Sequence, residues 1–471
     1  MPDYAIIPSE RQGPPAQPDH LRGRTVYTRR RVLGLATAGA MGAAFGACGR
    51  RSATPEADTR LTLSSAPITI VPFLSGISND MLSQWEEEIV VPYRQRRPNV
   101  KIDLIPQTGP SAERIEKLTT LIAAGTPPDL SEGPSPVRLM VAQHLLDPVL
   151  DTLVKRDKYD TKKYNTAHFE LGCVYEGKIW AIPNRYGGNA ICLACNTRLF
   201  AEAGIPLPPS DVSRAWTWED FVSNLTRLTK KDPSGEIAQF GLVGPAWLIG
   251  TWPPLWKTDW IDADLKTIIC DNPAMRDCYS KLADLYTRYH VLPQPGEASR
   301  LFGNANLFNT GKAAVLLFPP TGWRTYAANA QVDYALAPLP KVVVTTPDMG
   351  LSGISLLNGG KHPADAWDFL KYLVDGSRFA KFIGLMPAAL ADIEPWLRDQ
   401  FKNVPSADPK AMLRIVETAP GGNTKLFQHA RYVELVNVIN PAMDDLAAGK
   451  VAPVAMLQAL KPQLQAIIDK G

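Results

Sequence analysis

Residues 175–230 read YEGKIWAIPNRYGGNAICLACNTRLFAEAGIPLPPSDVSRAWTWEDFVSNLTRLTK, and this stretch indicates how the whole chain folds. Its first part, Tyr175 to Pro183, has the pattern of two short strands that turn about Gly177. The apolar run from Ala190 to Cys195 follows, and it has the length of a strand rather than of a helix. The first half of the stretch therefore predicts a hairpin followed by a buried strand.

The second half of the stretch predicts two helices. Asn196 is a suitable N-cap for a short helix that Gly204 ends. Thr217 is a suitable N-cap for a longer helix, because Glu219 and Asp220 place acidic side chains in its first turn. The chain thus passes directly from a strand into helices that belong to a different part of the molecule.

These parts, in this order, resemble the extracellular solute-binding proteins of ABC importers, in the carbohydrate-binding class whose members include the maltose-binding proteins. The family patterns "y.GkiyalP", "YNkdlF" and "aGl.pP.TWdef" match Tyr175 to Pro183, Cys195 to Phe200 and Ala203 to Phe221. Cys195 departs from the family, which has Tyr at this position. Thr126 to Leu130 similarly matches the family's "GtpPDvv", and the resemblance extends over about residues 67–471.

The resemblance implies an α/β fold of two lobes, each with a mainly parallel sheet flanked by helices. Three crossings between the lobes are expected near residues 191–196, 341–353 and 396–409. Lobe one would comprise 67–192 and 350–400, and lobe two 193–349 and 401–471. The alternation of strand and helix patterns after residue 67 independently predicts open parallel sheets.

Length and charge indicate two domains and no nucleic-acid partner. A chain of 471 residues is too long for one ordinary core. Met1 to Ala47 contains six Arg and three acidic residues, which accounts for the whole net charge of +3. The remainder is close to neutral, so we expect no nucleic-acid partner. No uninterrupted apolar stretch reaches about 18 residues, so no membrane span is expected.

The N-terminal segment has the features of an export signal. Residues 1–47 carry an Arg pair within Thr28 to Leu33, followed by a Gly/Ala-rich run, as in a twin-arginine lipoprotein signal. Small residues precede Cys48, which suits attachment of a lipid to its thiol. Residues 48–66 would form a tether to the outer face of the cytoplasmic membrane. A plain signal peptide or a short membrane anchor is the alternative.

Polar side chains follow two strands of the predicted lobe one. Ligands of open parallel sheets bind beyond the carboxyl ends of the strands, so these loops are candidates for contacts with sugar hydroxyls. Loop residues and helix caps are the alternative reading. The candidates are Ser75, Ser78, Asn79 and Asp80 after the first strand, and Ser131, Glu132 and Ser135 after the strand that Asp129 begins. We interpret Asp129 itself as structural.

Aromatic side chains form the second group of candidates, because their faces can stack on a pyranose ring. Four of the eleven tryptophans lie within residues 247–260. Trp247 or Trp252 would contact ligand, while most of this group would pack between helices. Trp323 follows a Pro/Gly loop after the strand that ends near Leu317, and it is the strongest single prediction.

Four more residues lie beside the first crossing or in lobe two. Arg185 precedes the crossing strand and could pair with a phosphate or carboxylate, or form a salt bridge within the protein. Tyr186 and Asn189 neighbour it, and Tyr432 lies near the start of the penultimate predicted helix. We include all of these among the predicted ligand contacts.

Several other chemistries lack the residues that they need. Gly311 and Lys312 do not form a P-loop, so ATP hydrolysis would belong to a separate subunit. The six His and six Cys show no zinc spacing, and we expect no cofactor or metal. Cys270 and Cys278 could form a disulfide, or remain as free buried thiols.

The sequence therefore predicts a monomeric, non-enzymatic protein that captures a sugar or oligosaccharide between two lobes and delivers it to an ABC permease. An alternative keeps this fold and binds a glycerol phosphodiester or another polar metabolite. An exported glycoside hydrolase is the rival function class, because it also combines carboxylates with aromatic residues. No hydrolase signature interrupts the order of the family segments.

Overall fold

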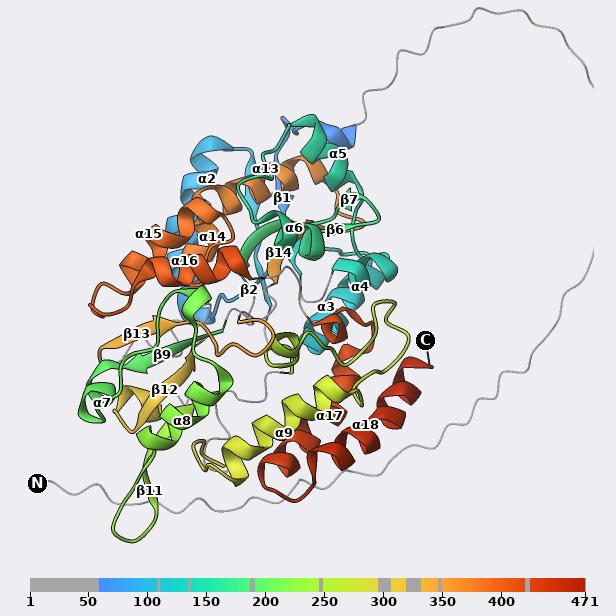
Figure 1. The fold of residues 1–471 in the computed structure, drawn as a ribbon. Helices are drawn as coiled ribbons and strands as arrows, with labels where there is room; N and C mark the ends of the chain where they lie inside the picture. The colour runs from blue at the N-terminus through green and yellow to red at the C-terminus, as the bar shows by residue number, and fades with distance from the viewer. Residues whose placement is uncertain are drawn as a thin grey trace, which may run out of the picture. The chain divides into compact units, whose positions relative to one another are not determined.

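The structure is a computed structural model, and it describes nine ranges of the chain. These ranges are 59–107, 111–133, 137–186, 191–244, 249–294, 306–318, 332–345, 350–419 and 424–470. The chain divides into two compact units, Met1–Pro55 and Glu56–Gly471, and every described residue belongs to the second. Two five-stranded sheets, with helices around them, organise this second unit (Figure 1).

Sheet one has the strand order β4-β2-β5-β14-β8. Its strands are β2 (Pro72–Ser75), β4 (Ile105–Gln107), β5 (Leu130–Glu132), β8 (Ile182–Tyr186) and β14 (Leu351–Leu356). β2 pairs in parallel with β4 and β5, and β14 runs antiparallel to both β5 and β8. The carboxyl ends of β2, β4, β5 and β8 therefore meet at one edge of the sheet, which we call the carboxyl edge.

Sheet two has the order β10-β11-β12-β9-β13. Its strands are β9 (Cys192–Asn196), β10 (Lys230–Lys231), β11 (Ile237–Val243), β12 (Ala313–Phe318) and β13 (Tyr334–Ala337). β11 and β12 are parallel, whereas β9 runs antiparallel to β12 and β13. β9 follows β8 of sheet one, and β14 follows β13 of sheet two, and the described residues between the two strands of each pair contain no helix. Both β9 and β14 run antiparallel to their neighbours in the sheet.

Two smaller strand pairs complete the sheets. β1 (Ile68–Ile70) pairs in parallel with β3 (Val100–Ile102). β6 (Val174–Tyr175) and β7 (Lys178–Ile179) form an antiparallel hairpin. Gly177 has a φ of 71° in this turn, a backbone conformation that glycine adopts without steric cost. The predicted hairpin about Gly177 is confirmed.

Helices begin and end close to the residues expected from the sequence. The predicted caps are formed: Asn196 accepts a hydrogen bond from Leu199 N, and Thr217 and Asp220 form a reciprocal capping box. A π-helical segment, Glu86–Val90, lies before Pro92 in the first long helical stretch. The α-helices are α1 (Leu82–Trp85), α2 (Val91–Arg96), α3 (Ser111–Ala123), α4 (Val137–Ala142), α5 (Val149–Arg156), α6 (Thr166–Cys173), α7 (Thr197–Glu202), α8 (Trp218–Leu228), α9 (Pro273–Thr287), α13 (Pro363–Val374), α14 (Arg378–Phe382), α15 (Leu390–Gln400), α16 (Pro409–Thr418), α17 (Tyr432–Ala447) and α18 (Pro453–Ile468).

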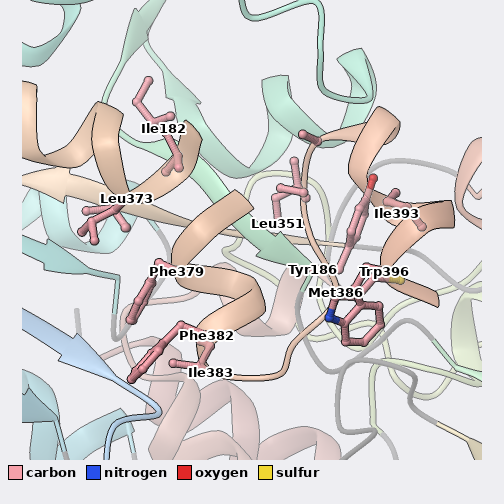
Figure 2. Close-up of a cluster of buried hydrophobic side chains, with 14 of the residues drawn as sticks. Ile182, Tyr186, Leu351, Leu373, Phe379, Phe382, Ile383, Met386, Ile393 and Trp396 are labelled. Atoms are coloured by element: carbon pink, nitrogen blue, oxygen red, sulfur yellow. The ribbon is translucent and has the colours of Figure 1, made fainter. Parts of the chain in front are cut away.

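Each sheet contributes to a large apolar core. One cluster joins sheet one to α13, α14, α15 and α16, and it also includes Phe318 and Tyr334 of sheet two. Figure 2 shows part of it, where Ile182 and Tyr186 of β8 lie with Leu351 of β14 and the aromatic side chains of α14 and α15. The second cluster packs sheet two against α8, α9, α17 and α18. The predicted boundaries of the two lobes remain predictions.

The described cysteines are thiols. Cys173, Cys192, Cys195, Cys270 and Cys278 are all buried and unpaired with one another. Burial raises the pKa of the Cys270 thiol to about 12, so this group stays protonated at neutral pH. Of the two alternatives for Cys270 and Cys278, the structure shows free thiols. In the nine described ranges, no helix combines the length and apolar character that crossing a membrane requires.

Candidate functional site

The carboxyl edge of sheet one brings together polar side chains that lie far apart in the sequence. Ser75, Gln107 and Glu132 are the last residues of β2, β4 and β5, and Arg185 lies near the end of β8. These four strands point the same way, so their last residues meet at one edge. Such an edge is where open α/β sheets bind their ligands.

Glu132 is the centre of this group. Its side chain is only 2% exposed, and both of its carboxylate oxygens accept hydrogen bonds. Arg185 Nε donates to Oε1 at 2.6 Å, and Asn184 Nδ2 lies 3.4 Å from the same oxygen. Ser75 Oγ donates to Oε2. A buried carboxylate needs such partners, because its desolvation is otherwise very costly.

Gln107 and Ser131 hold the backbone beneath Glu132. Gln107 Nε2 donates to the carbonyl oxygens of Phe73 and Glu132 at 2.6 and 2.9 Å. It also lies 3.1 Å from Ser131 Oγ, which itself donates to the Glu132 carbonyl. Ser131 is fully buried. These bonds tie β2, β4 and β5 together and give Ser131 a structural position rather than a surface for ligand.

Arg185 is the partly accessible member of the group. Its side chain is 18% exposed, and Glu132 holds it at Nε. Nη1 makes one long contact, 3.4 Å to the Tyr186 carbonyl oxygen, and Nη2 has no partner within the described part of the chain. The ion pair therefore fixes the direction of the guanidinium and leaves its terminal nitrogens available for hydrogen bonds.

Arg114 and Tyr432 lie close to this pair. Burial lowers the pKa of the Arg114 guanidinium, and the charge of Arg185 lowers it further, while Glu132 and Tyr432 act in the opposite direction. Tyr432, at the start of α17, packs edge-on against Phe427 with ring centroids 6.2 Å apart. The predicted residues Glu132, Arg185 and Tyr432 thus all influence Arg114 electrostatically.

Tyr186 occupies a different environment from the one predicted. It is fully buried among the apolar side chains of Figure 2. Its hydroxyl lies 3.1 Å from Nδ1 of the buried His168, whose Nε2 lies 3.2 Å from the Ala419 carbonyl. Tyr186 points into this core, whereas the neighbouring Arg185 is held at the carboxyl edge by Glu132. This burial argues against the predicted ligand contact of Tyr186.

Trp252 is also a core residue. It is 1% exposed, and its ring meets the edge of Trp218 at a centroid distance of 6.1 Å. Trp256 and Trp260 are buried in the same cluster, and their ring nitrogens donate to Asp277 and to the Ile249 carbonyl. The structure therefore favours the packing alternative for Trp252.

Asn79 and Asp80 are exposed at the start of a short 3₁₀-helix, Asn79–Met81. A hydrogen bond from Ser78 holds the pKa of the Asp80 carboxyl below its usual value. The helix has Ser78 as its N-cap and no side-chain cap hydrogen bond, so Asn79 and Asp80 fit the alternative of exposed loop residues. Four predicted ligand contacts, Trp323, Trp247, Ser135 and Asn189, lie outside the described residues, as does Cys48.

The sequence analysis missed Gln107, Arg114 and Asn184. Gln107 satisfies the same rule that selected Ser75 and Glu132, because it ends a parallel strand at the carboxyl edge. Asn184 directly precedes Arg185 in β8. The sequence pattern points less clearly to Arg114, because only the folded structure brings α3 beside Gln107. There Arg114 Nη1 lies 3.4 Å from Gln107 Oε1.

A cavity of about 900 Å³ lies away from this group. Its lining includes Thr69, Asp129 and His362, and it shares no residue with the network around Glu132. Asp129 Oδ2 accepts from Val71 N at 2.8 Å and Oδ1 from Lys361 N at 3.1 Å, a structural role. Among the described residues, no cluster of three His, Cys, Asp or Glu side chains could hold a metal.

Comparisons with known proteins agree with this architecture. The family model for bacterial extracellular solute-binding proteins matches residues 77–375. A substrate-binding protein from Listeria monocytogenes, in complex with cycloalternan, is similar with a TM-score of 0.68 and 16% identity, covering 85% of this chain and 99% of that one. The maltose/maltodextrin-binding domain from Bdellovibrio bacteriovorus, bound to maltotriose, is similar with a TM-score of 0.63 and 20% identity, covering 85% and 100%. No curated protein gives a significant match.

Proposed function

The chain belongs to the bacterial extracellular solute-binding proteins, and from this premise we propose that it captures a sugar or oligosaccharide and delivers it to an ABC permease. The observation that carries the proposal is the family match over residues 77–375, which includes most strands of both sheets. The carboxyl edge of sheet one supplies hydrogen-bonding groups where this kind of fold receives its ligand.

Carbohydrate is the ligand class that the similar structures favour. The two similar structures described above were solved with cycloalternan and maltotriose. A binding protein from the same comparison was solved with mannotriose, at 19% identity and a TM-score of 0.61. At such identities the likeness establishes the fold alone, so carbohydrate binding by this chain is our proposal.

Binding without cleavage fits the environment of Glu132. A glycoside hydrolase needs a carboxylic acid that can deliver a proton to the leaving oxygen and a second carboxylate near it. Glu132 accepts hydrogen bonds at both oxygens and is paired with Arg185. This arrangement suits a residue that orients a neighbour and does not suit a general acid.

Export and anchoring complete the proposal. The twin-arginine pattern of residues 28–33 would export the chain, and a lipid on Cys48 would hold it at the outer face of the cytoplasmic membrane. A ligand-loaded protein held there would encounter the permease by diffusion in two dimensions. The ATPase would be a separate subunit, because Gly311 and Lys312 do not form a nucleotide-binding loop.

A ligand screen tests the proposed function. We expect at least one sugar from a panel of mono- and oligosaccharides to raise the melting temperature of the full chain, because ligand that binds only the folded state stabilises it. Calorimetry should then give a 1:1 stoichiometry, and chromatography should recover the sugar intact. Release of shorter sugars would support the hydrolase instead, and a panel without any binder would refute the proposal.

A further inference from the structure

Several basic residues of the described chain lie around the carboxyl edge of sheet one. Arg114 and Arg185 lie near Glu132, and Tyr432 connects this group to the start of α17. There, the pKa of His429 is lowered by burial and by the charges of Arg431 and Arg138. Arg138 comes from α4, where its guanidinium lies 5.6 Å from the ring centroid of Tyr175.

The acidic residues among these groups are already paired. Glu132 is engaged at both oxygens by Ser75 and Arg185. Glu434 forms a salt bridge with Arg431 at 2.8 Å. Among the described residues, Glu132 is thus paired with Arg185 and Glu434 with Arg431, and Arg114 brings a further positive charge close to Glu132. Asp80 and Glu113 are exposed to water, where their charges are screened.

Arg185 has the geometry of a residue that receives an anion. Glu132 binds Nε, which is the side of the guanidinium nearest the chain, and this contact restricts its rotation. The terminal nitrogens are the pair that binds a carboxylate or phosphate in a bidentate manner. A guanidinium oriented before binding loses less conformational entropy when the ligand arrives.

We propose that the carboxyl edge of sheet one binds an acidic group of the carbohydrate, a carboxylate or a phosphate, and that Arg185 contacts this group directly. Glu132 acts as a positioning residue for Arg185, and Arg114 adds a second positive charge nearby. This inference rests on the proposed function and narrows its ligand class from sugars in general to acidic sugars. It also extends the sequence-based expectation that Arg185 could pair with an anion.

The test compares sugars that share a skeleton and differ in charge. Glucose, glucuronic acid and glucose 1-phosphate would be titrated into the full chain by calorimetry, with maltotriose and its terminally oxidised acid as longer probes. We expect the acidic member of at least one set to bind roughly tenfold or more tightly than its neutral partner. The preference should shrink as the salt concentration rises, because an ionic contact is screened.

Variants assign the effect to Arg185. Arg185→Gln should abolish the preference for the acid while Arg185→Lys, which keeps the charge without the fork, should retain part of it. Glu132→Gln keeps the hydrogen-bond acceptor for Arg185 and should weaken acid binding less than Arg185→Gln. Arg198→Gln is the matched control, since Arg198 is an exposed arginine of α7 paired with Glu202 at 2.5 Å. Each variant would first be shown to have an intact melting transition.

The outcomes separate this inference from the proposed function. Neutral sugars that bind as tightly as their acids would overturn the inference and leave the proposed function standing. Binding of inorganic phosphate or a glycerol phosphodiester through Arg185, with no sugar bound, would overturn the proposed function and keep the anion site. An acid preference that survives in Arg185→Gln would overturn the role of Arg185.

Discussion

Arg185 and Glu132 show how one buried ion pair can orient a side chain toward solvent. The pair joins β5 to β8 across β14, so it also contributes to the order of strands at this edge. A buried ion pair is weak evidence for stability, because the cost of desolvating both charges offsets their attraction. Removing one partner leaves an unpaired buried charge, which is much worse. The pair is therefore better explained by the direction that it gives Arg185 than by stability.

Trp323 remains the aromatic residue with the strongest sequence argument for stacking on a sugar. Trp323→Ala should weaken sugar binding roughly tenfold or more, because one stacked ring face contributes on the order of 1 to 3 kcal/mol. The melting temperature of the unliganded chain should change little. Calorimetry with the sugar found by the screen measures the effect, and unchanged affinity in a folded variant would assign Trp323 to packing.

Trp252 should respond in the opposite way. Its ring is buried against Trp218, so Trp252→Ala would leave a large cavity and lower the free energy of unfolding by about 3 to 5 kcal/mol. Denaturant titration of the full chain measures this loss. If Trp252→Ala were as stable as the parent and bound sugar more weakly, Trp252 would be a ligand contact after all.

At the scale of elements, α8 and β11 lie unusually close. Gly241 of β11 faces the last turn of α8, and its N–H donates to Thr229 Oγ1 at 3.1 Å. A Cβ at this position would lie 2.2 Å from the Leu225 carbonyl oxygen. Only glycine permits this approach, so the helix that begins at the Thr217 capping box can rest directly on sheet two.

Gly241→Ala should therefore destabilise the protein by at least about 1 to 3 kcal/mol, because the helix must move away from the strand. Ala238→Val, at an exposed position of the same strand, is the control and should be nearly neutral or slightly favourable. Melting temperatures of the two variants compare them directly. Equal stability of Gly241→Ala and the parent would mean that α8 moves at little cost.

At the scale of the whole molecule, the chain passes repeatedly between the two sheets. β8 of sheet one leads to β9 of sheet two, and β13 of sheet two leads to β14 of sheet one. The segment after α15 contacts the residue that precedes β13, since Ser406 N donates to the Asp333 carboxylate at 3.0 Å. Short connections of this kind are where hinge motions between rigid parts are found.

We predict that ligand closes the protein about these connections. Small-angle scattering of the full chain should give a smaller radius of gyration with saturating ligand than without it. The strand pairing within each sheet should be preserved, because the rotation would take place in the connecting segments. An unchanged scattering profile, despite binding proven by calorimetry, would contradict the prediction.

Membrane attachment is predicted to depend on one thiol. Cys48→Ser should yield unprocessed or released protein, because only a cysteine at this position can accept the lipid. Mass spectrometry and detergent partitioning of the parent and the variant measure this difference. A parent chain that carries no lipid mass and stays in the aqueous phase would contradict the anchor.

The sequence by itself determined the family, the order of strands and helices, and many of their ends. These features depend on local chemistry: Asn196 and Thr217 cap helices wherever the chain places them, and Gly177 permits its turn. Motifs that combine such signals in a fixed order, as in residues 175–230, identify a fold because their joint occurrence by chance is rare.

Only the tertiary structure decided which polar and aromatic residues are partly exposed at the carboxyl edge and which are buried in the core. Arg185 and Tyr186 are adjacent in the sequence, yet one is partly exposed at the carboxyl edge and the other fully buried against His168. Likewise, Trp252 has the loop-like surroundings of a sugar-binding residue and is buried against Trp218. Burial depends on which distant elements pack over a side chain, and the charges that surround Arg185 come from strands and helices that only folding brings together.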